Sequence, residues 1–228
     1  MISTRRLLIR RVAAALIVAA ATSGALANLL VDAGFEDPNI AIGDFGQVVG
    51  PPFSPGFWGA EQGNKTTAEN GLTPLEGTSM LHLSKRSDEQ TQAWQAVDLS
   101  GFAAFIDSGN AVATFGASYN VPEGAPGKDG PAHALASIMF FDDINGWPDY
   151  TLIETSSADL DEDAGSWEPV VVNTAVPVGT RWALVEVHFV NATLTAYGGY
   201  VDDTFFTIPE PASLALLATG VFVLLRRR

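Results

Sequence analysis

The feature that most constrains this chain of 228 residues is the spacing of apolar residues between positions 28 and 208. No stretch there sustains an apolar period of 3.6 residues. Short runs that alternate, or are almost wholly apolar, recur at 80–83, 111–119, 133–141, 167–173, 181–190 and 199–208. Breaker-rich segments such as 121–131 and 145–148 separate them. Because alternating runs and dense breakers are typical of strands and turns, the pattern predicts an all-β protein, an antiparallel sandwich or barrel.

The composition excludes several classes of function. A hydrophobic fraction of 47% is ample for a core, and the lack of cysteine excludes disulfides, thiolate metal sites and cysteine nucleophiles. The net charge of −14 hides a partition, since seven of the twelve basic residues lie at the two ends. Residues 28–208 hold five basic residues against 25 acidic ones, a net charge of −20. Such a body repels nucleic acid and anionic lipid, so no nucleic acid is expected as a partner, whereas cations are attracted.

The N-terminus has the three parts of a secretory signal peptide. Two arginine pairs precede an apolar stretch at 12–21, and small residues follow at Ala25 and Ala27. This pattern predicts a signal peptide over residues 1–27, which signal peptidase removes after Ala27. The apolar stretch is shorter than the ~20 residues that span a bilayer. Export by the general secretory route or by the twin-arginine route stays open.

The C-terminus ends in a Pro-Glu-Pro tripeptide, an uncharged stretch and an arginine cluster. These parts are Pro209, Glu210 and Pro211, then residues 212–225, then Arg226, Arg227 and Arg228. A helix of 14 residues is about 21 Å long, which is short for a hydrocarbon core of ~30 Å. Local thinning and the positive-inside preference of the arginines nevertheless allow a transmembrane helix that anchors the chain.

The order of these three parts resembles the PEP-CTERM sorting signal of bacteria with exopolysaccharide-rich surfaces. The resemblance covers residues 208–228. It implies that an exosortase recognises the tail and cuts near the tripeptide. It also implies a transient stay in the inner membrane through the C-terminal helix, and then a place at the cell surface or in the extracellular matrix.

The body also resembles a known group of folds. Its succession of short pieces, from Gly34-Phe35-Glu36-Asp37 through Trp94-Gln95-Ala96-Val97 to Tyr200-Val201-Asp202-Asp203, is similar to carbohydrate-binding-module-like jelly rolls with a galactose-binding-domain-like fold. The resemblance implies a jelly-roll sandwich over residues 28–207. It also implies a structural calcium ion between the first and last strands, with Glu36 and Asp202 or Asp203 as ligands. The alternative is that these carboxylates are solvated residues at a sheet edge.

The run 181–190 predicts two different faces of one strand. Ala183, Val185 and Val187 alternate with Trp182, Glu186 and His188. Aromatic side chains stack on sugar rings and polar groups bind their hydroxyls, so the second face is a candidate sugar-binding surface, with Trp58 in a loop at its rim. The alternative is that Trp94, Trp167 and Trp182 belong to the core.

The sequence lacks the G-x-S-x-G and H-E-x-x-H motifs and any phosphate-cradling glycine loop, so no enzyme is expected. We therefore predict an exported, exosortase-processed bacterial surface or matrix protein. Its carbohydrate-binding-like domain is non-catalytic and associates with exopolysaccharide. Two alternatives stay open: a purely structural surface protein that binds only calcium, and a glycoside-active enzyme.

Overall fold

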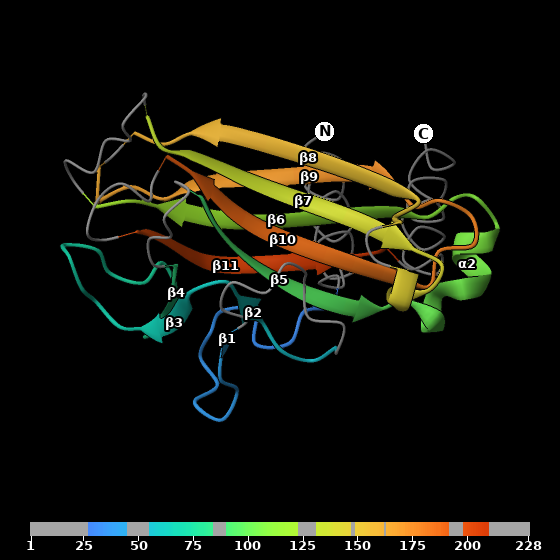
Figure 1. Cartoon of the computed structure of the whole chain (residues 1–228), viewed down its shortest axis with the longest axis horizontal. Coiled ribbons are helices and arrows are strands. Elements are labelled where there is room, and N and C mark those ends of the chain that lie inside the picture. The colour runs from blue at the N-terminus through green and yellow to red at the C-terminus, as the bar shows by residue number, and fades with distance from the viewer. Residues whose placement is uncertain are drawn as a thin grey trace, which may run out of the picture. The chain divides into compact units, whose positions relative to one another are not determined.

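The computed structural model describes residues 27–44, 55–83, 90–122, 131–146, 149–161, 163–191 and 198–209. Residues 28–207 form one compact unit (Figure 1). The predicted transmembrane helix lies outside the described residues, as does the predicted signal peptide apart from Ala27. No helix among the described residues is long and apolar enough to cross a membrane.

The body is built from two β-sheets, and the prediction of an all-β class is confirmed. Sheet A has the order β1 (Gly43–Asp44), β2 (Gly59–Ala60), β5 (Gln90–Asp98), β10 (Trp182–Val190), β7 (His133–Phe141) and β8 (Leu152–Asp159). Sheet B has the order β3 (Gly63–Thr66), β4 (Met80–Leu83), β11 (Gly199–Thr207), β6 (Val112–Asn120) and β9 (Glu168–Ala175). The described helices are the short η1 (Ser100–Phe102), α2 (Ala103–Asp107) and η2 (Ile144–Gly146). Apart from the short parallel pair β1–β2, the described strand pairs are antiparallel, as in a jelly-roll sandwich.

The core lies between the two sheets, and every second side chain of β10 points into it. Ala183, Val185 and Val187 have no exposed surface, which confirms the predicted inward face of this strand. Phe189 continues that face and meets the edge of the Tyr119 ring from β6, with ring centroids 5.4 Å apart. The buried tyrosine keeps its hydroxyl satisfied because it donates to the Leu135 carbonyl at 2.7 Å.

The apolar and alternating runs in the sequence did not predict strands β5 and β8. Strand β8 is the edge of sheet A, and none of its residues is buried; most of them are serine, threonine or acidic residues. An edge strand with one neighbour buries little side-chain surface, so no apolar alternation marks it in the sequence. The acidic segment from Asp159 to Asp163 is predicted from the sequence as a charged loop, and this is wrong for Asp159, which is the last residue of β8. The described residues Leu160, Asp161 and Asp163 do lie outside strands.

The start of the body lies beside the last strand, as the jelly-roll resemblance implied. Leu29 N donates to the Phe206 carbonyl at 2.8 Å, and Phe206 N donates to Asn28 Oδ1 at 3.0 Å. Asn28 Nδ2 reaches the Thr204 carbonyl at 2.9 Å. The residues that follow form turns and bends, and Glu36 lies in an irregular stretch between two turns and not in the predicted first strand.

Candidate functional site

The outer face of sheet A collects the polar and aromatic side chains that the sequence placed opposite the core. The strand registers set Trp94 of β5 beside Glu186 of β10, Ser137 of β7 and Thr155 of β8. The next row toward the β10 C-terminus holds Gln92, His188, Leu135 and Ser157 in the same order. We call these two rows the polar end of the face.

The other end of the face is apolar and largely covered. Its buried side chains are Ala96, Met139, Phe141, Leu184 and Ile144 of η2, and the half-buried Trp182 packs against them. Trp94 of the polar end borders this cluster and packs with it. Tyr150 adds its ring edge to Phe141, with centroids 6.4 Å apart. Trp182 is therefore part of an apolar cluster outside the sandwich core, a placement that neither sequence interpretation described.

Glu186 is the central carboxyl group of the polar end, and it is only 9% exposed. Trp94 Nε1 donates to its Oε1 at 3.1 Å. Burial raises the pKa of Glu186, and the nearby Glu61 charge acts in the same direction, while hydrogen bonds from Ser137 and Trp94 oppose the rise. The result is a fixed carboxyl group, ready to accept hydrogen bonds from hydroxyl or amino groups.

His188 lies half-buried one row further, with its Nε2 3.4 Å from Gln92 Nε2. Trp182, Glu186 and His188 thus share one face, as predicted, although Trp182 belongs to the apolar end. Sequence reasoning missed Gln92 and Ser137 as members of the site and left Trp94 to the core. No alternation marked β5, because Gln90, Thr91 and Gln92 begin it with three polar residues and the polar Gln95 is buried within it.

The placement of Trp58 at a loop rim was wrong. Its side chain is completely buried and packs on Phe35, with ring centroids 5.6 Å apart and planes tilted by 49°. It immediately precedes β2, which pairs with β5, so its ring lies where the N-terminal segment meets sheet A. By contrast, Tyr150, which contacts Phe141, is 41% exposed.

Asp202 and Glu36 hold the two halves of one loop, residues 75–79. The buried Asp202 accepts the N–H groups of Leu75 at 2.8 Å and Glu76 at 3.1 Å on Oδ2, and that of Asp203 at 2.8 Å on Oδ1. Burial nevertheless raises the pKa of Asp202 to about 6. Asp203 is exposed and has a left-handed backbone with φ 47°, in an irregular part of the β11–β6 ladder.

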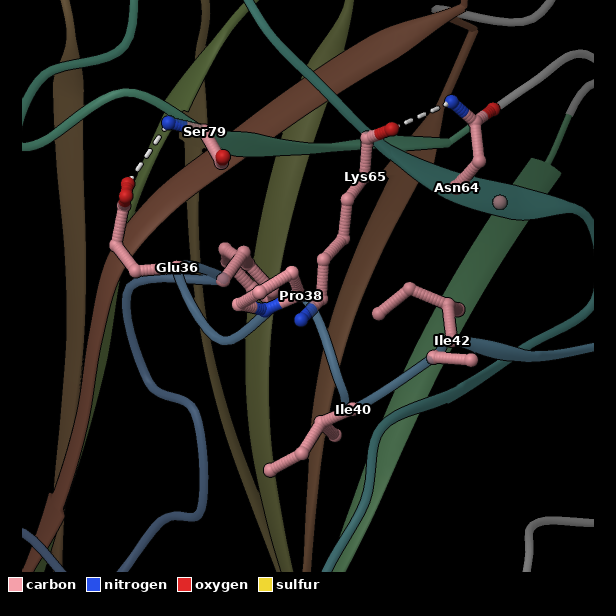
Figure 2. Close-up of a pocket in the computed structure, with 10 residues that line it drawn as sticks. Glu36, Pro38, Ile40, Ile42, Asn64, Lys65 and Ser79 are labelled. Carbon is pink, nitrogen blue, oxygen red and sulfur yellow. Dashed lines mark hydrogen bonds between the residues drawn. The ribbon is translucent and has the colours of Figure 1, made fainter.

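Glu36 holds the other half of this loop. It accepts the N–H groups of Thr78 at 2.9 Å and Ser79 at 2.7 Å, and the Ser79 contact is drawn in Figure 2. Hydrogen bonds from Ser79 and Thr78 lower the pKa of Glu36. Gly77 has φ +59°, and a Cβ there would lie 2.4 Å from Glu36 Oε1, so only glycine permits this approach.

This arrangement does not fit a calcium ion as it stands. The carboxylate oxygens of Glu36 and Asp202 face N–H donors, whereas calcium requires oxygen ligands around it. The residues that the structure describes contain no group of three or more His, Asp or Glu side chains that could hold a metal. Calcium binding by Glu36, Asp202 and Asp203 stays a prediction.

A pocket of about 430 Å³ lies beside this loop. Figure 2 shows Pro38, Ile40 and Ile42 from the N-terminal segment opposite Asn64 and Lys65 from β3. The Lys65 ammonium group is already engaged, because it contacts the Asp32 carboxylate and donates to the Asp37 carbonyl at 2.6 Å. No sequence pattern predicts this pocket, because its lining comes from three separate segments, residues 35–42, 63–65 and 79.

Three carboxyl groups with raised pKa values, those of Glu168, Asp202 and Glu186, make the stability of the body depend on pH. Burial, together with the neighbouring Asp161, raises the pKa of Glu168 to about 7, and the pKa of Asp202 is about 6. Their ordinary values are 4.5 and 3.8. Because the folded state binds these protons more tightly than the unfolded state, this contribution is fully present below about pH 4 and is lost as the pH rises through about 7. Groups with lowered pKa values, such as Glu36 and Asp107, have the opposite effect. They stabilise the folded state when they are ionised, so their contribution is lost as the pH falls through the acidic range.

We therefore expect a lower melting temperature at about pH 8 than at about pH 5. Glu168→Gln removes one of these groups and should reduce this decline. Glu154→Gln is the matched control, because it removes an exposed carboxylate from β8. Thermal melts across the pH range measure the effect, and an unchanged slope in Glu168→Gln would contradict the role of Glu168.

Comparisons with known proteins bear on the C-terminal tail and on the fold. Residues 207–228 match the family model described as the PEP-CTERM protein-sorting motif. The chain ends in a PEP-CTERM sorting motif. This finding confirms the resemblance of the tail, and the motif implies an exported surface protein that an exosortase processes. No curated protein matches the chain in sequence.

Similar solved structures include two carbohydrate-binding modules and a cyclase. The CBM22-1 xylan-binding domain of Paenibacillus barcinonensis Xyn10C has 14% identity and a TM-score of 0.49, covering 81% of this chain and 96% of that chain. TmCBM61, in complex with β-1,4-galactotriose, has 16% identity and a TM-score of 0.48, covering 80% and 99%. A cyclase from Fischerella sp. TAU has 11% identity and a TM-score of 0.49, covering 80% and 98%.

Proposed function

We propose that this chain is an exported surface or matrix protein whose sandwich binds carbohydrate, without catalysis, through the polar end of the outer face of sheet A. The sorting motif at 207–228 supports the export and the processing by an exosortase. The observation that carries the binding role is the fixed Glu186 carboxyl group beside Trp94, in a row with Ser137 and Thr155.

The chemistry of these two rows suits a sugar. A pyranose ring presents hydroxyl groups around its edge and apolar C–H groups on its faces, so it requires both hydrogen-bonding and apolar partners. Glu186, Ser137 and Thr155 supply acceptors and hydroxyls, and His188 adds a ring that can stack or donate. Thr155 is exposed and His188 is half-buried, so both can meet a ligand from solvent.

The likeness to carbohydrate-binding modules is one of fold, so the side chains of this face have to support the binding role. Exopolysaccharide is the ligand we propose, because the sorting motif directs the protein to the surface where such polymers lie. Turnover of any substrate in a panel of glycosides by the purified chain would contradict the non-catalytic part of the proposal.

A histidine pair offers a matched test of the binding face. His188 lies on the polar end, whereas His82 is half-buried on β4 in sheet B, stacked on Tyr200 with centroids 4.6 Å apart. We expect His188→Ala to weaken glycan binding about tenfold, which corresponds to the loss of roughly one hydrogen bond. We expect His82→Ala to leave binding unchanged. Glycan arrays identify a ligand for the full chain in mild detergent, and calorimetry then compares the variants.

Equal binding by both variants and the parent chain would remove the polar end from the proposal, and no binding to any glycan would remove the carbohydrate role.

Processing is tested separately by the intact mass of protein recovered from envelope or medium. The mature species should lack residues 1–27 and the arginine-bearing tail. A species that still ends at Arg228 in a host with an exosortase would contradict processing.

A further inference from the structure

The basic residues of the described body are engaged away from the polar end. Its lysine and arginine side chains are Lys65 and Arg181, within a body of net charge −20. Lys65 lies on β3 of sheet B and pairs with Asp32. Arg181 precedes β10 at the apolar end and forms a two-pronged pair with Asp107, at 2.8 and 3.0 Å. Neither ammonium nor guanidinium group among the described residues is thus available to an anionic ligand at the polar end.

Among the described residues, the carboxyl groups on and beside the polar end are not balanced by lysine or arginine. Glu186 lies at its centre, and Glu61 is close enough to raise the pKa of Glu186. Asp159 lies at its border on β8, where it contacts His133 Nδ1 at 2.5 Å. A ligand that carries carboxylates or sulfates would be repelled here, whereas a protonated amine would be attracted to the same charges.

We infer that the polar end recognises a glycan with free, protonated amino groups, that is, a hexosamine polymer that is wholly or partly de-N-acetylated, and that Glu186 accepts the ammonium group. This inference rests on the proposed carbohydrate-binding function and names its ligand class. Acetylation of the same nitrogen would remove both the positive charge and two donor hydrogens, so the N-acetylated polymer should bind less tightly.

The surroundings of Glu186 prepare it for this role. Trp94 Nε1 fixes Oε1, so little side-chain freedom is lost when a ligand binds. The hydroxyl groups in the same row are ordered as well, because Thr155 Oγ1 donates to Ser137 Oγ at 3.1 Å. They offer oxygen acceptors to the remaining ammonium hydrogens.

Binding of an amine should also move a proton. Burial favours the protonated form of Glu186, and a bound ammonium group favours the ionised form, so an amine expels a proton from any protonated fraction. The other titratable groups near Glu186 are Glu61 beside β2 and His188 on β10, whereas Tyr119 contacts Phe189 on the opposite, core side of the sheet. The Glu61 charge disfavours a negative charge on Glu186, which adds to the benefit of a cation.

The test compares two six-sugar oligomers that differ only in acetylation, fully N-acetylated β-1,4-glucosamine and its fully de-N-acetylated form. Calorimetry of the full chain in mild detergent, in two buffers with different ionisation enthalpies, gives both affinity and proton release. We expect the amino oligomer to bind at least tenfold more tightly and to release protons. Glu186→Gln should abolish the difference and the release, whereas Glu154→Gln, with the same change of net charge, should keep both.

Each outcome decides the inference. Equal or tighter binding of the N-acetylated oligomer would overturn the amine preference while leaving carbohydrate binding in place. Retention of the preference in a folded Glu186→Gln variant would overturn the role of Glu186. Absence of binding to both oligomers overturns the inference, and the glycan array then decides the proposed function independently. The comparison of oligomers uses the unmodified chain, so it holds even where a variant fails to fold.

Discussion

Replacement of Asp202 by alanine is expected to lower the free energy of unfolding by about 3 kcal/mol. Its carboxylate accepts N–H groups from Leu75, Glu76 and Asp203, and no part of the Asp202 side chain is exposed. The alanine variant leaves these donors without their acceptor and opens a small cavity beneath the loop 75–79. For a body of this size the melting temperature should fall by roughly 10 °C. Denaturant titration of the variant measures the effect.

Asp203→Asn is the control for this change, because asparagine tolerates the left-handed backbone at that position and the side chain is exposed. A loss of stability as large as that of Asp202→Ala would show that β11, and not the carboxylate anchor, is responsible.

Thermal melts of the same protein test the calcium prediction. A higher melting temperature with calcium than with chelator, abolished in Glu36→Gln but kept in Asp161→Asn, would support the calcium prediction.

Replacement of Trp58 by alanine is expected to cost about 3–5 kcal/mol of stability, which is typical of a large aromatic side chain removed from a core. The side chain has no exposed surface, and it contacts Phe35 where the N-terminal segment meets sheet A. Chemical denaturation measures the loss. If Trp58 lined a sugar-binding rim instead, the alanine variant would lose affinity but little stability.

Trp58→Phe separates packing from hydrogen bonding at this position. Within the described residues the Trp58 Nε1 group has no hydrogen-bond partner, so phenylalanine loses only part of the packed volume. We expect it to cost less than half as much as alanine and to leave glycan binding unchanged. A phenylalanine variant as unstable as the alanine variant would point to a contact of the indole nitrogen that packing alone does not explain.

The elements that sequence analysis predicted are those in which burial repeats with a simple period. Strand β10 is the clearest case, since Ala183, Val185 and Val187 are all buried and their neighbours form the opposite face. Strand β8 escaped detection because an edge strand is buried on too little of its surface to require apolar residues. Glu36 and Asp202 both hold the loop 75–79, but sequence analysis did not predict this loop as their partner.

Those partners are N–H groups of the main chain, which leave no mark in the sequence of side chains. The approach of Gly77 to Glu36 depends on a positive φ at Gly77, and the sequence alone does not show which of its many glycines has one. Trp94 shows the same limit on the candidate face. Its neighbour Glu186 lies 92 residues further along the chain, and only the pairing of β5 with β10 brings them into contact.

The bonds between Asn28 and the last strand also determine how the body carries a mechanical load. Strand β11 lies inside sheet B, between β4 and β6, and Asn28 and Leu29 add hydrogen bonds to its C-terminal half. Tension applied beyond Thr207 would act along this strand and would load its ladder bonds together, in shear, instead of opening them one by one from an edge. A body pulled at its sorting end while its opposite sheet holds a polymer would therefore resist extraction of its last strand.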